Sequence, residues 1–295
     1  MLFIIPSAWA YRCERPKITD HDYDIVDCLF EDLARVKQGD RWGFIDKASA
    51  IVIPLQDYTH VSIFSEDLAS VQKDGKYGFI DKTGKKVIDF QYDDAWDFNN
   101  GLAAVKKDDK WGFIDQTGEV IIPLQFDSVA ENFKEDENLA TVKQNGKYGF
   151  IDKTGKVIIP LEYDDALGFW EGLAAVKQDG KWGFIDDIGK MIIPMKYDGA
   201  WSFNEGLVGV KQNDKWGFID KSNKVVVGFQ FDEATGFNEG LASIRMGDRW
   251  GFIDKTGATV IPLEYDYAWY FEDGLAQVLK DGEVFYIDKQ GQRVK

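Results

Sequence analysis

Lys215-Trp216-Gly217-Phe218-Ile219-Asp220 is one copy of a hexapeptide that decides the fold, because it recurs along the chain. The pattern [KR]-[WY]-G-F-I-D occurs seven times in the 295 residues, and a decayed eighth copy stands at residues 283–288. Successive glycines of the pattern are 34 to 37 residues apart, at Gly43, Gly78, Gly112, Gly149, Gly183, Gly217 and Gly251. A period of this size indicates tandem repeats, each forming one supersecondary unit.

Residues 23–295 contain about eight copies of a longer unit, and each copy predicts three strands. The segment L-A-x-V-K alternates with period two, as a strand with one buried face does. W-G-F-I-D is the second strand. V-I-I-P is the third, and its proline ends it by withholding a ladder donor. No segment shows helical periodicity with caps.

The loops between these strands have an explicit turn chemistry. The first loop contains only Gly, Asn and Asp, as in Asp179-Gly180 and Asn213-Asp214. A two-residue type I′ hairpin favours these residues because both central positions need positive φ. The second loop, D-K-T-G, is closed by glycine in six units and by Asn223 in another. The three strands are therefore predicted to form an antiparallel meander.

The repeated K-W-G-F-I-D-K-T-G resembles the WG (or KWG) β-repeats found in bacterial proteins. The resemblance covers essentially residues 23–295. It implies an array of variable length that serves as a β-rich interaction module, and it brings no catalytic residue set. The hairpin is also loosely similar to choline-binding cell-wall repeats, but those units are shorter and carry different aromatic residues.

The fold class expected is all-β, with tandem three-stranded meanders forming an open superhelix or solenoid. The alternative is a closed eight-unit β-propeller. The recurrent strand glycine implies close packing on its backbone, by the Trp or Phe of the next unit. Residues 1–22 are interpreted as an N-terminal strand or cap and not as an export signal. Phe3-Ile4-Ile5-Pro6 resembles the strand that the eighth unit lacks, so it serves either ring closure or capping.

Charge and composition exclude several classes of function. The net charge of -16 disfavours binding to nucleic acid or to anionic lipid, which both need a basic face. No apolar run approaches the roughly 20 residues that span a bilayer. The only cysteines, Cys13 and Cys28, fit one bridge or two free thiols equally well, so they leave the compartment open.

The sequence contains no recognisable catalytic or metal-binding motif, and we expect no enzyme activity, cofactor or metal. His21 and His60 are the only histidines, and neither recurs in other units, so we interpret both as surface residues. Asp recurs at two positions of the unit, after its first Tyr or Phe and at the end of W-G-F-I-D. Rows of carboxylates suit cations or sugar hydroxyls, but the second position always opens a turn. We therefore favour turn capping for both.

The tryptophans fall into two groups. Trp42, Trp111, Trp182, Trp216 and Trp250 occupy the repeat position and are predicted to lie in the core or in a stacking ladder. Trp96, Trp201 and Trp269 each follow the unit's Tyr by four residues, at a position that elsewhere holds Asp27, Ser62 or Thr235. These three, with Trp170 as a weaker fourth, are the candidate ligand-binding residues. Packing between connections is the alternative for them.

Together these features predict a non-enzymatic scaffold whose repeated surface binds by many small contacts. The net charge and the family resemblance favour a protein or peptide partner with basic character. The alternative is a carbohydrate- or cell-envelope-binding module that uses the exposed tryptophans.

Overall fold

The computed structural model describes residues 14–18, 23–131, 133 and 138–294. Within these ranges every regular secondary-structure element is a β-strand. The strands form eight four-stranded sheets, which we number sheet 1 to sheet 8 in chain order. The predicted all-β tandem array is therefore confirmed, and none of the described sheets closes on itself.

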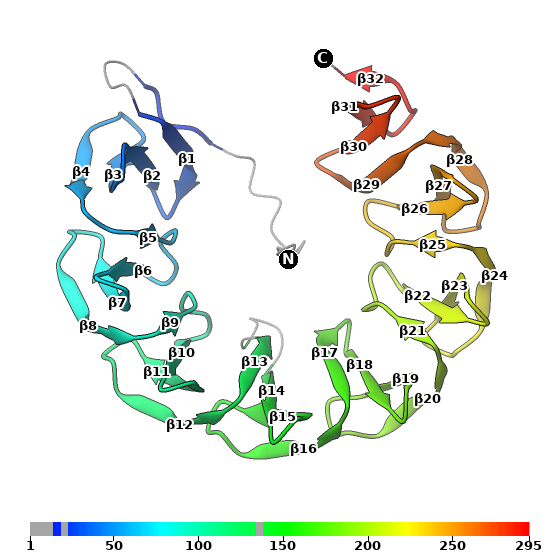
Figure 1. Cartoon of the computed structure of the whole chain (residues 1–295), viewed down its shortest axis with the longest axis horizontal. Helices are drawn as coiled ribbons and strands as arrows, with labels where there is room; N and C mark the ends of the chain where they lie inside the picture. Colours follow the sequence, from blue (N-terminus) through cyan, green and yellow to red (C-terminus); the bar gives the residue numbers. More distant parts are fainter. Residues whose placement is uncertain (1–13, 19–22, 132, 134–137, 295) are drawn as a thin grey trace. The chain divides into compact units, whose positions relative to one another are not determined.

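The chain divides into two compact units, Met1–Asn145 with Ile151–Lys156, and Gly146–Phe150 with Val157–Lys295. The first unit holds sheets 1 to 3 (Figure 1). Their strands are β1 (Ile25–Phe30), β2 (Leu33–Gln38), β3 (Arg41–Asp46), β4 (Ile51–Gln56), β5 (His60–Val61), β6 (Leu68–Lys73), β7 (Lys76–Asp81), β8 (Lys86–Tyr92), β9 (Asp94–Ala95), β10 (Leu102–Lys107), β11 (Lys110–Asp115) and β12 (Val120–Phe126).

Sheet 4 contains the boundary between the units, and the second unit holds sheets 5 to 8. The strands of sheet 4 are β13 (Ser128–Glu131), β14 (Leu139–Gln144), β15 (Lys147–Asp152) and β16 (Val157–Tyr163). Those of sheets 5 to 8 are β17 (Asp165–Trp170), β18 (Leu173–Gln178), β19 (Lys181–Ile185), β20 (Met191–Tyr197), β21 (Gly199–Ala200), β22 (Leu207–Gln212), β23 (Lys215–Asp220), β24 (Val225–Phe231), β25 (Glu233–Ala234), β26 (Leu241–Met246), β27 (Arg249–Asp254), β28 (Thr259–Tyr265), β29 (Tyr267–Glu272), β30 (Leu275–Lys280), β31 (Glu283–Asp288) and β32 (Arg293–Val294).

Each sheet is a meander whose four strands are hydrogen-bonded in chain order, and the structure adds a first strand to the three predicted (Figure 1). In sheet 6 this strand is β21, where Gly199 lies opposite Lys211 and Ala200 opposite Val210. Four of the eight first strands, β5, β9, β21 and β25, have only two residues. Two residues leave no alternation to detect, which is why the sequence did not predict this strand.

The hairpin turns have the predicted geometry. In the turn between β22 and β23, Asn213 and Asp214 have φ values of 51° and 64°. In the turn between β18 and β19, Asp179 and Gly180 have φ values of 49° and 77°. Two consecutive positive φ values define the type I′ turn, so the prediction from Gly, Asn and Asp is confirmed.

The repeat glycine is required by a strand of its own sheet. A Cβ added to Gly183 would lie 2.6 Å from the carbonyl oxygen of Ile193 and 2.9 Å from the backbone nitrogen of Met195. The last strand of the sheet, β20, therefore passes directly over the glycine. The expectation of close packing is confirmed, but its source was wrong, because the neighbour is this strand's backbone and not an aromatic side chain of the next unit.

The hydrophobic core lies between consecutive sheets. We call the sheet face that bears the repeat Trp and Phe the trailing face, because it packs against the next sheet of the chain. In the second unit, the trailing face of sheet 5 packs Phe184 against Phe203, which lies just beyond β21 of sheet 6, with ring centroids 5.1 Å apart. Phe218–Phe237 and Phe252–Phe271 repeat this contact at 4.7 and 4.8 Å. One sheet alone cannot bury these rings, so each repeat depends on its neighbour.

At the N-terminal end, described residues 14–18 contact sheet 1. Leu29 N donates to the carbonyl oxygen of Glu14 and Lys17 N to that of Lys47, at 2.8 and 3.2 Å. Cys28 is disulfide-bonded, which answers one question the sequence left open. The remaining residues of the predicted cap, 1–13 and 19–22, lie outside the described residues.

Candidate functional site

The Asp that ends W-G-F-I-D caps the following turn. Asp220 Oδ1 accepts hydrogen bonds from the backbone nitrogens of Ser222 and Lys224 at 2.9 and 3.0 Å. The hydroxyl of Ser222 also donates to this carboxylate, and this bond is the main reason why the pKa of Asp220 is lowered. The turn-capping interpretation is confirmed here, so this row of carboxylates is already engaged by the fold.

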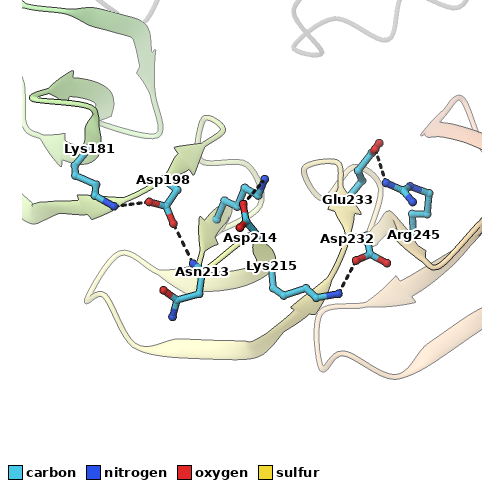
Figure 2. Close-up of polar contacts among 9 residues, drawn as sticks. Lys181, Asp198, Asn213, Asp214, Lys215, Asp232, Glu233 and Arg245 are labelled. Carbon is cyan, nitrogen blue, oxygen red and sulfur yellow. Dashed lines mark hydrogen bonds and ion pairs between the residues drawn. The ribbon is translucent and has the colours of Figure 1, made fainter.

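The Asp near the start of the repeat joins neighbouring sheets where a Lys or Arg of the preceding sheet pairs with it. In Figure 2, the side chain of Lys181 and the backbone of Asn213 converge on Asp198. Asp198 Oδ2 accepts from Asn213 N at 2.9 Å, which caps the hairpin of sheet 6, while Oδ1 pairs with Lys181 of sheet 5. Asp232 repeats the arrangement with Lys215. This Asp therefore caps a turn, as predicted, and in addition bridges two sheets.

A glutamate that the sequence analysis did not single out forms a second bridge between sheets. The Glu205 carboxylate accepts hydrogen bonds from Gly240 N at 3.0 and 3.2 Å and pairs with Lys255 Nζ at 3.1 Å. Glu205 lies in the first hairpin of sheet 6, whereas Gly240 and Lys255 belong to sheet 7. The sequence signal was available, because acidic residues precede the glycine of F-x-x-G and Lys follows W-G-F-I-D in most units. Equivalent contacts start from Glu171 and Glu239.

Trp201 is the most accessible of the candidate tryptophans. It is 42% exposed and stacks on Trp216, with centroids 5.4 Å apart and planes 11° apart. Its indole nitrogen donates to the carbonyl oxygen of Ala234 in sheet 7 at 2.9 Å. Trp201 is thus a packing residue that also leaves an aromatic surface exposed, and ligand binding by it stays a prediction.

Sheet 8 carries a second exposed aromatic group in the second unit. Tyr267, Trp269 and Tyr270 all lie on β29, and Tyr267 and Tyr270 are 40% and 39% exposed. The Tyr267 ring lies 4.4 Å from that of Trp269 and 5.0 Å from that of Trp250. Trp269 itself is half-buried.

The other two candidate tryptophans are less accessible than Trp201. Trp96, in the first unit, is half-buried and meets Trp111 edge-on, with centroids 5.6 Å apart. Trp170 is half-buried at the end of β17, paired with Leu173. Trp201 and Trp269 occupy equivalent positions two sheets apart in the second unit, whereas Trp170 is in sheet 5 at a different position of the repeat.

The residue across from each candidate position explains its variability. Trp201 lies opposite Gly209, whose added Cβ would be 3.0 Å from the Trp201 Cδ1 atom. At the same two positions, Ser70 N donates to Ser62 Oγ, Thr235 and Ser243 hydroxyls lie 2.9 Å apart, and Asp27 pairs with Arg35 at 2.5 Å. At Trp201 a large ring is thus accommodated by a small partner, and at the three polar positions a polar residue meets a polar one, whereas Gln277 lies across from Trp269 in sheet 8.

A buried polar cluster in the first unit was not predicted. Ser70 Oγ donates to Asp97 Oδ1 at 3.3 Å, linking sheets 2 and 3. Burial raises the pKa of Asp97, against the opposing effects of hydrogen bonds from Ser62 and Ser70 and of the charges of His60 and Arg35. His60 is exposed, as interpreted, and burial of its ring followed by the charge of Arg35 lowers its pKa. The sequence did not indicate a role for Asp97, because the corresponding position in other units holds unrelated residues.

Among the described residues, no three His, Cys, Asp or Glu side chains are grouped so that they could hold a metal ion. Nor does this part of the chain contain a helix with the length and apolarity to cross a membrane.

Comparison with solved structures gives the fold and no more. A crystal structure described as that of the eukaryotic initiation factor is similar over 96% of this chain and 89% of its own, with TM-score 0.63 and 11% identity. Apo AztD from Citrobacter koseri is similar over 87% and 91%, with TM-score 0.42 and 11% identity. Four-stranded antiparallel sheets in tandem are also the blade unit of β-propellers. A comparison with curated proteins gives no match.

The family model of the WG containing repeat matches seven consecutive segments that together run from residue 42 to residue 283. The segments are 42–77, 77–111, 111–148, 148–182, 182–216, 216–250 and 250–283. A repeat β-fold of this kind suggests a binding or scaffold module. The chain belongs to the family of WG containing repeat proteins.

Proposed function

We propose that the protein is a non-enzymatic scaffold that binds a protein or peptide with basic character, with Trp201 as a contact residue. The observation that carries this is the half-exposed Trp201 stacked on Trp216. An aromatic face attracts Lys and Arg side chains, and the attraction is strengthened by carboxylates around it. The repeat itself offers a precedent, because Arg35 lies over the ring of Trp42 at 5.0 Å and Lys37 at 5.4 Å.

The charge distribution supports a basic partner. Many of the lysines and arginines are held by the protein's own carboxylates, such as Lys181 by Asp198, Lys215 by Asp232 and Lys255 by Glu205. With a net charge of -16, the unbalanced charges of the chain are carboxylates. Glu233 immediately precedes Ala234, the residue to which the Trp201 indole is bonded, but Glu233 is itself paired with Arg245, so the attraction comes from the net charge of the chain. A cationic partner is thus steered by the long-range field and meets an aromatic ring at contact.

A second function, binding of a carbohydrate, is favoured by the same ring. Sugar rings stack on exposed indoles, and two aromatic surfaces, at Trp201 and at Tyr267 with Tyr270, lie on the second unit. Stacking of a neutral sugar does not depend on charge. Salt therefore separates the two functions, because screening weakens contacts between exposed charges and leaves ring stacking nearly unchanged.

The test measures binding of the full chain to a fluorescent nona-arginine peptide and to neutral cell-envelope polysaccharide, at about 50 and about 300 mM NaCl, which shorten the screening length to near 14 and 6 Å. We expect the peptide to bind, and its affinity to fall at high salt. Trp201→Ala should weaken binding, whereas Trp201→Phe, which keeps a ring but not the indole donor, should bind nearly as the parent does. Trp170→Ala is the matched control.

The two functions both predict that Trp201→Ala weakens binding, but they differ in the ligand bound and in its response to salt. Polysaccharide binding that survives high salt and disappears in Trp201→Ala, with no binding of the arginine peptide, would replace the first function by the second. Arginine-peptide binding that is unaffected by Trp201→Ala would remove Trp201 from the site and leave charge alone as the basis of recognition.

A further inference from the structure

The trailing face of sheet 8 differs in exposure from the same face of the sheets before it. In sheet 7 this face carries Leu241, Ser243, Trp250 and Phe252, which are 7%, 0%, 4% and 0% exposed. In sheet 8 the same register positions hold Leu275, Gln277, Val284 and Tyr286. Val284 and Tyr286 are 52% and 49% exposed, and Leu275 and Gln277 are partly exposed. Within the described residues, sheet 8 therefore offers an uncovered copy of a surface that is elsewhere buried.

The following sheet covers this surface in sheets 6 and 7 with residues of several strands, and one short segment of that cover carries its central aromatic ring. For sheet 6 the segment runs from Ala234 through Phe237 to Gly240, and for sheet 7 from Ala268 through Phe271 to Gly274. Each has the pattern A-x-x-F-x-x-G. The phenylalanine ring packs on the repeat Phe of the sheet it covers, as Phe271 does on Phe252 at 4.8 Å.

The same segment is also held through its backbone. On sheet 6, Trp201 Nε1 donates to the carbonyl oxygen of Ala234 at 2.9 Å and Asn204 Nδ2 to that of Phe237 at 2.8 Å. The Glu205 carboxylate accepts from Gly240 N. The carbonyl oxygen of the small residue thus binds an indole donor, and that of the aromatic residue binds an amide donor. The N–H of the glycine binds a carboxylate.

Sheet 8 presents two of these three groups at the corresponding positions. Trp269 stands where Trp201 does, and Asp273 where Glu205 does, with a φ of 51° against 53°. Glu272 replaces the asparagine, so the amide donor is absent from sheet 8. Among the described residues, nothing accepts a hydrogen bond from the Trp269 indole, and no backbone N–H donates to Asp273. The indole donor and the turn carboxylate that hold the segment on sheet 6 are therefore present in sheet 8 beside the exposed apolar face.

We propose that the trailing face of sheet 8 binds a peptide segment with the pattern A-x-x-F-x-x-G, supplied by a partner protein. Its aromatic residue packs on Tyr286 and Leu275, one of its carbonyl oxygens accepts from the Trp269 indole, and its glycine N–H donates to Asp273. The basis is continuity with the interfaces already formed between sheets 6 and 7 and between sheets 7 and 8. This deepens the proposed function, on which it rests, by naming a second surface and the segment that it recognises.

The experiment titrates the full chain into a fluorescent synthetic peptide with the sequence of residues 196–207, KYDGAWSFNEGL, which carries the pattern at Ala200, Phe203 and Gly206. Fluorescence anisotropy reports binding. We expect saturable binding that the Phe203→Ala peptide loses by about tenfold or more, because the central aromatic anchor dominates such contacts. High salt should change this binding little, in contrast to that of the arginine peptide, so failure of one assay does not imply failure of the other.

Variants of the protein locate the site. Tyr286→Arg places a charge where the aromatic anchor packs, and Tyr286 is exposed enough that the sheet should fold as before. Ile188→Arg is the matched control, since Ile188 is 74% exposed in a turn of sheet 5. Trp269→Phe removes the indole donor and keeps a ring. We expect about tenfold weaker binding for Tyr286→Arg, an intermediate loss for Trp269→Phe and none for Ile188→Arg. Absence of saturable binding, or equal binding by Tyr286→Arg and the parent, would overturn the proposal.

Discussion

The Cβ position of Gly183 lies 2.6 Å from the carbonyl oxygen of Ile193, closer than any real side chain can approach. The strand that contains Ile193 cannot move away, because the same residue packs in the core between sheets 5 and 6. We therefore expect Gly183→Ala to lower the free energy of unfolding by about 1–3 kcal/mol, the usual effect of overpacking. Urea denaturation followed by circular dichroism measures it.

Gly228→Ala is the control for that variant. Gly228 lies in strand β24, and a Cβ added there meets no atom within 4 Å. Because alanine also restricts the unfolded chain, this change should leave stability unchanged or raise it slightly. Equal destabilisation by both variants would mean that glycine is needed for backbone freedom and not for the approach of the outer strand.

Glu205 provides a test of the bridges between sheets. Glu205→Ala removes hydrogen bonds to the backbone of Gly240 and the ion pair with Lys255. Since Gly240 N is partly buried and would lose its partner, we expect unfolding free energy to fall by about 1–2 kcal/mol. Glu233→Ala breaks only an exposed pair with Arg245 and should change stability by less than about 0.5 kcal/mol. If the two variants are equally stable, the bridge makes no measurable contribution to the free energy of unfolding.

Acid should weaken the fold through the turn-capping aspartates. Hydrogen bonds lower the pKa of Asp81, Asp115, Asp152, Asp220 and Asp254 in the folded state. Their contribution is complete above the unfolded value of about 3.9 and disappears as pH falls through the lower folded value. Melting temperature should therefore drop below about pH 4. Asp220→Asn should make that drop shallower, and an unchanged acid profile in this variant would contradict the assignment.

Asp97 should have the opposite effect on the pH dependence of stability. Burial raises its folded pKa, so its stabilising contribution is present below the unfolded value of about 3.9 and is lost as pH rises through the folded value. Asp97→Asn keeps a group that can bond to Ser70 and removes the buried charge. We expect this variant to gain melting temperature relative to the parent at pH 7 and to show no gain near pH 3. A gain that is equal at both pH values would show that charge burial is not the cause.

The sequence predicts much of this fold because the same strand and turn residues recur in about eight units. Strands, turns and the glycine constraint all follow from residues such as Asp179-Gly180 and Gly183, whose effects are local. The contacts between sheets were not predicted, because Glu205 and Gly240 are 35 residues apart, and their recurrence in the repeat does not by itself show that they meet across two sheets. Asp97 was missed for a related reason. Burial raises its pKa against the hydrogen bonds from Ser62 and Ser70 of another sheet, so only the assembled core reveals it.

At the candidate site, too, the sequence predicts the position of a residue but not the contacts that it makes in the folded protein. The position of Trp96 and Trp201 was identified from its variability between units, but the orientation of each indole depends on the residue across from it. Trp201 lies flat on Trp216, at 11°, where the opposite residue is Gly209. Trp96 meets Trp111 at 62° where the opposite residue is Ala104. A Cβ at Gly209 would lie 3.0 Å from Trp201 Cδ1, so we infer that the methyl group of the opposite residue sets the orientation of the indole.

Exchanging these two small residues should therefore exchange the two indole arrangements. Gly209→Ala should tilt Trp201 away from Trp216, which reduces the coupling between the stacked indoles and changes the near-ultraviolet circular dichroism. Ala104→Gly should let Trp96 approach the stacked geometry and change the same signal in the opposite sense. If Trp201 is the contact residue proposed here, Gly209→Ala also alters affinity for the arginine peptide, whereas Ala104→Gly does not. A crystal structure of Gly209→Ala with Trp201 still parallel to Trp216 would show that the opposite residue does not set the orientation.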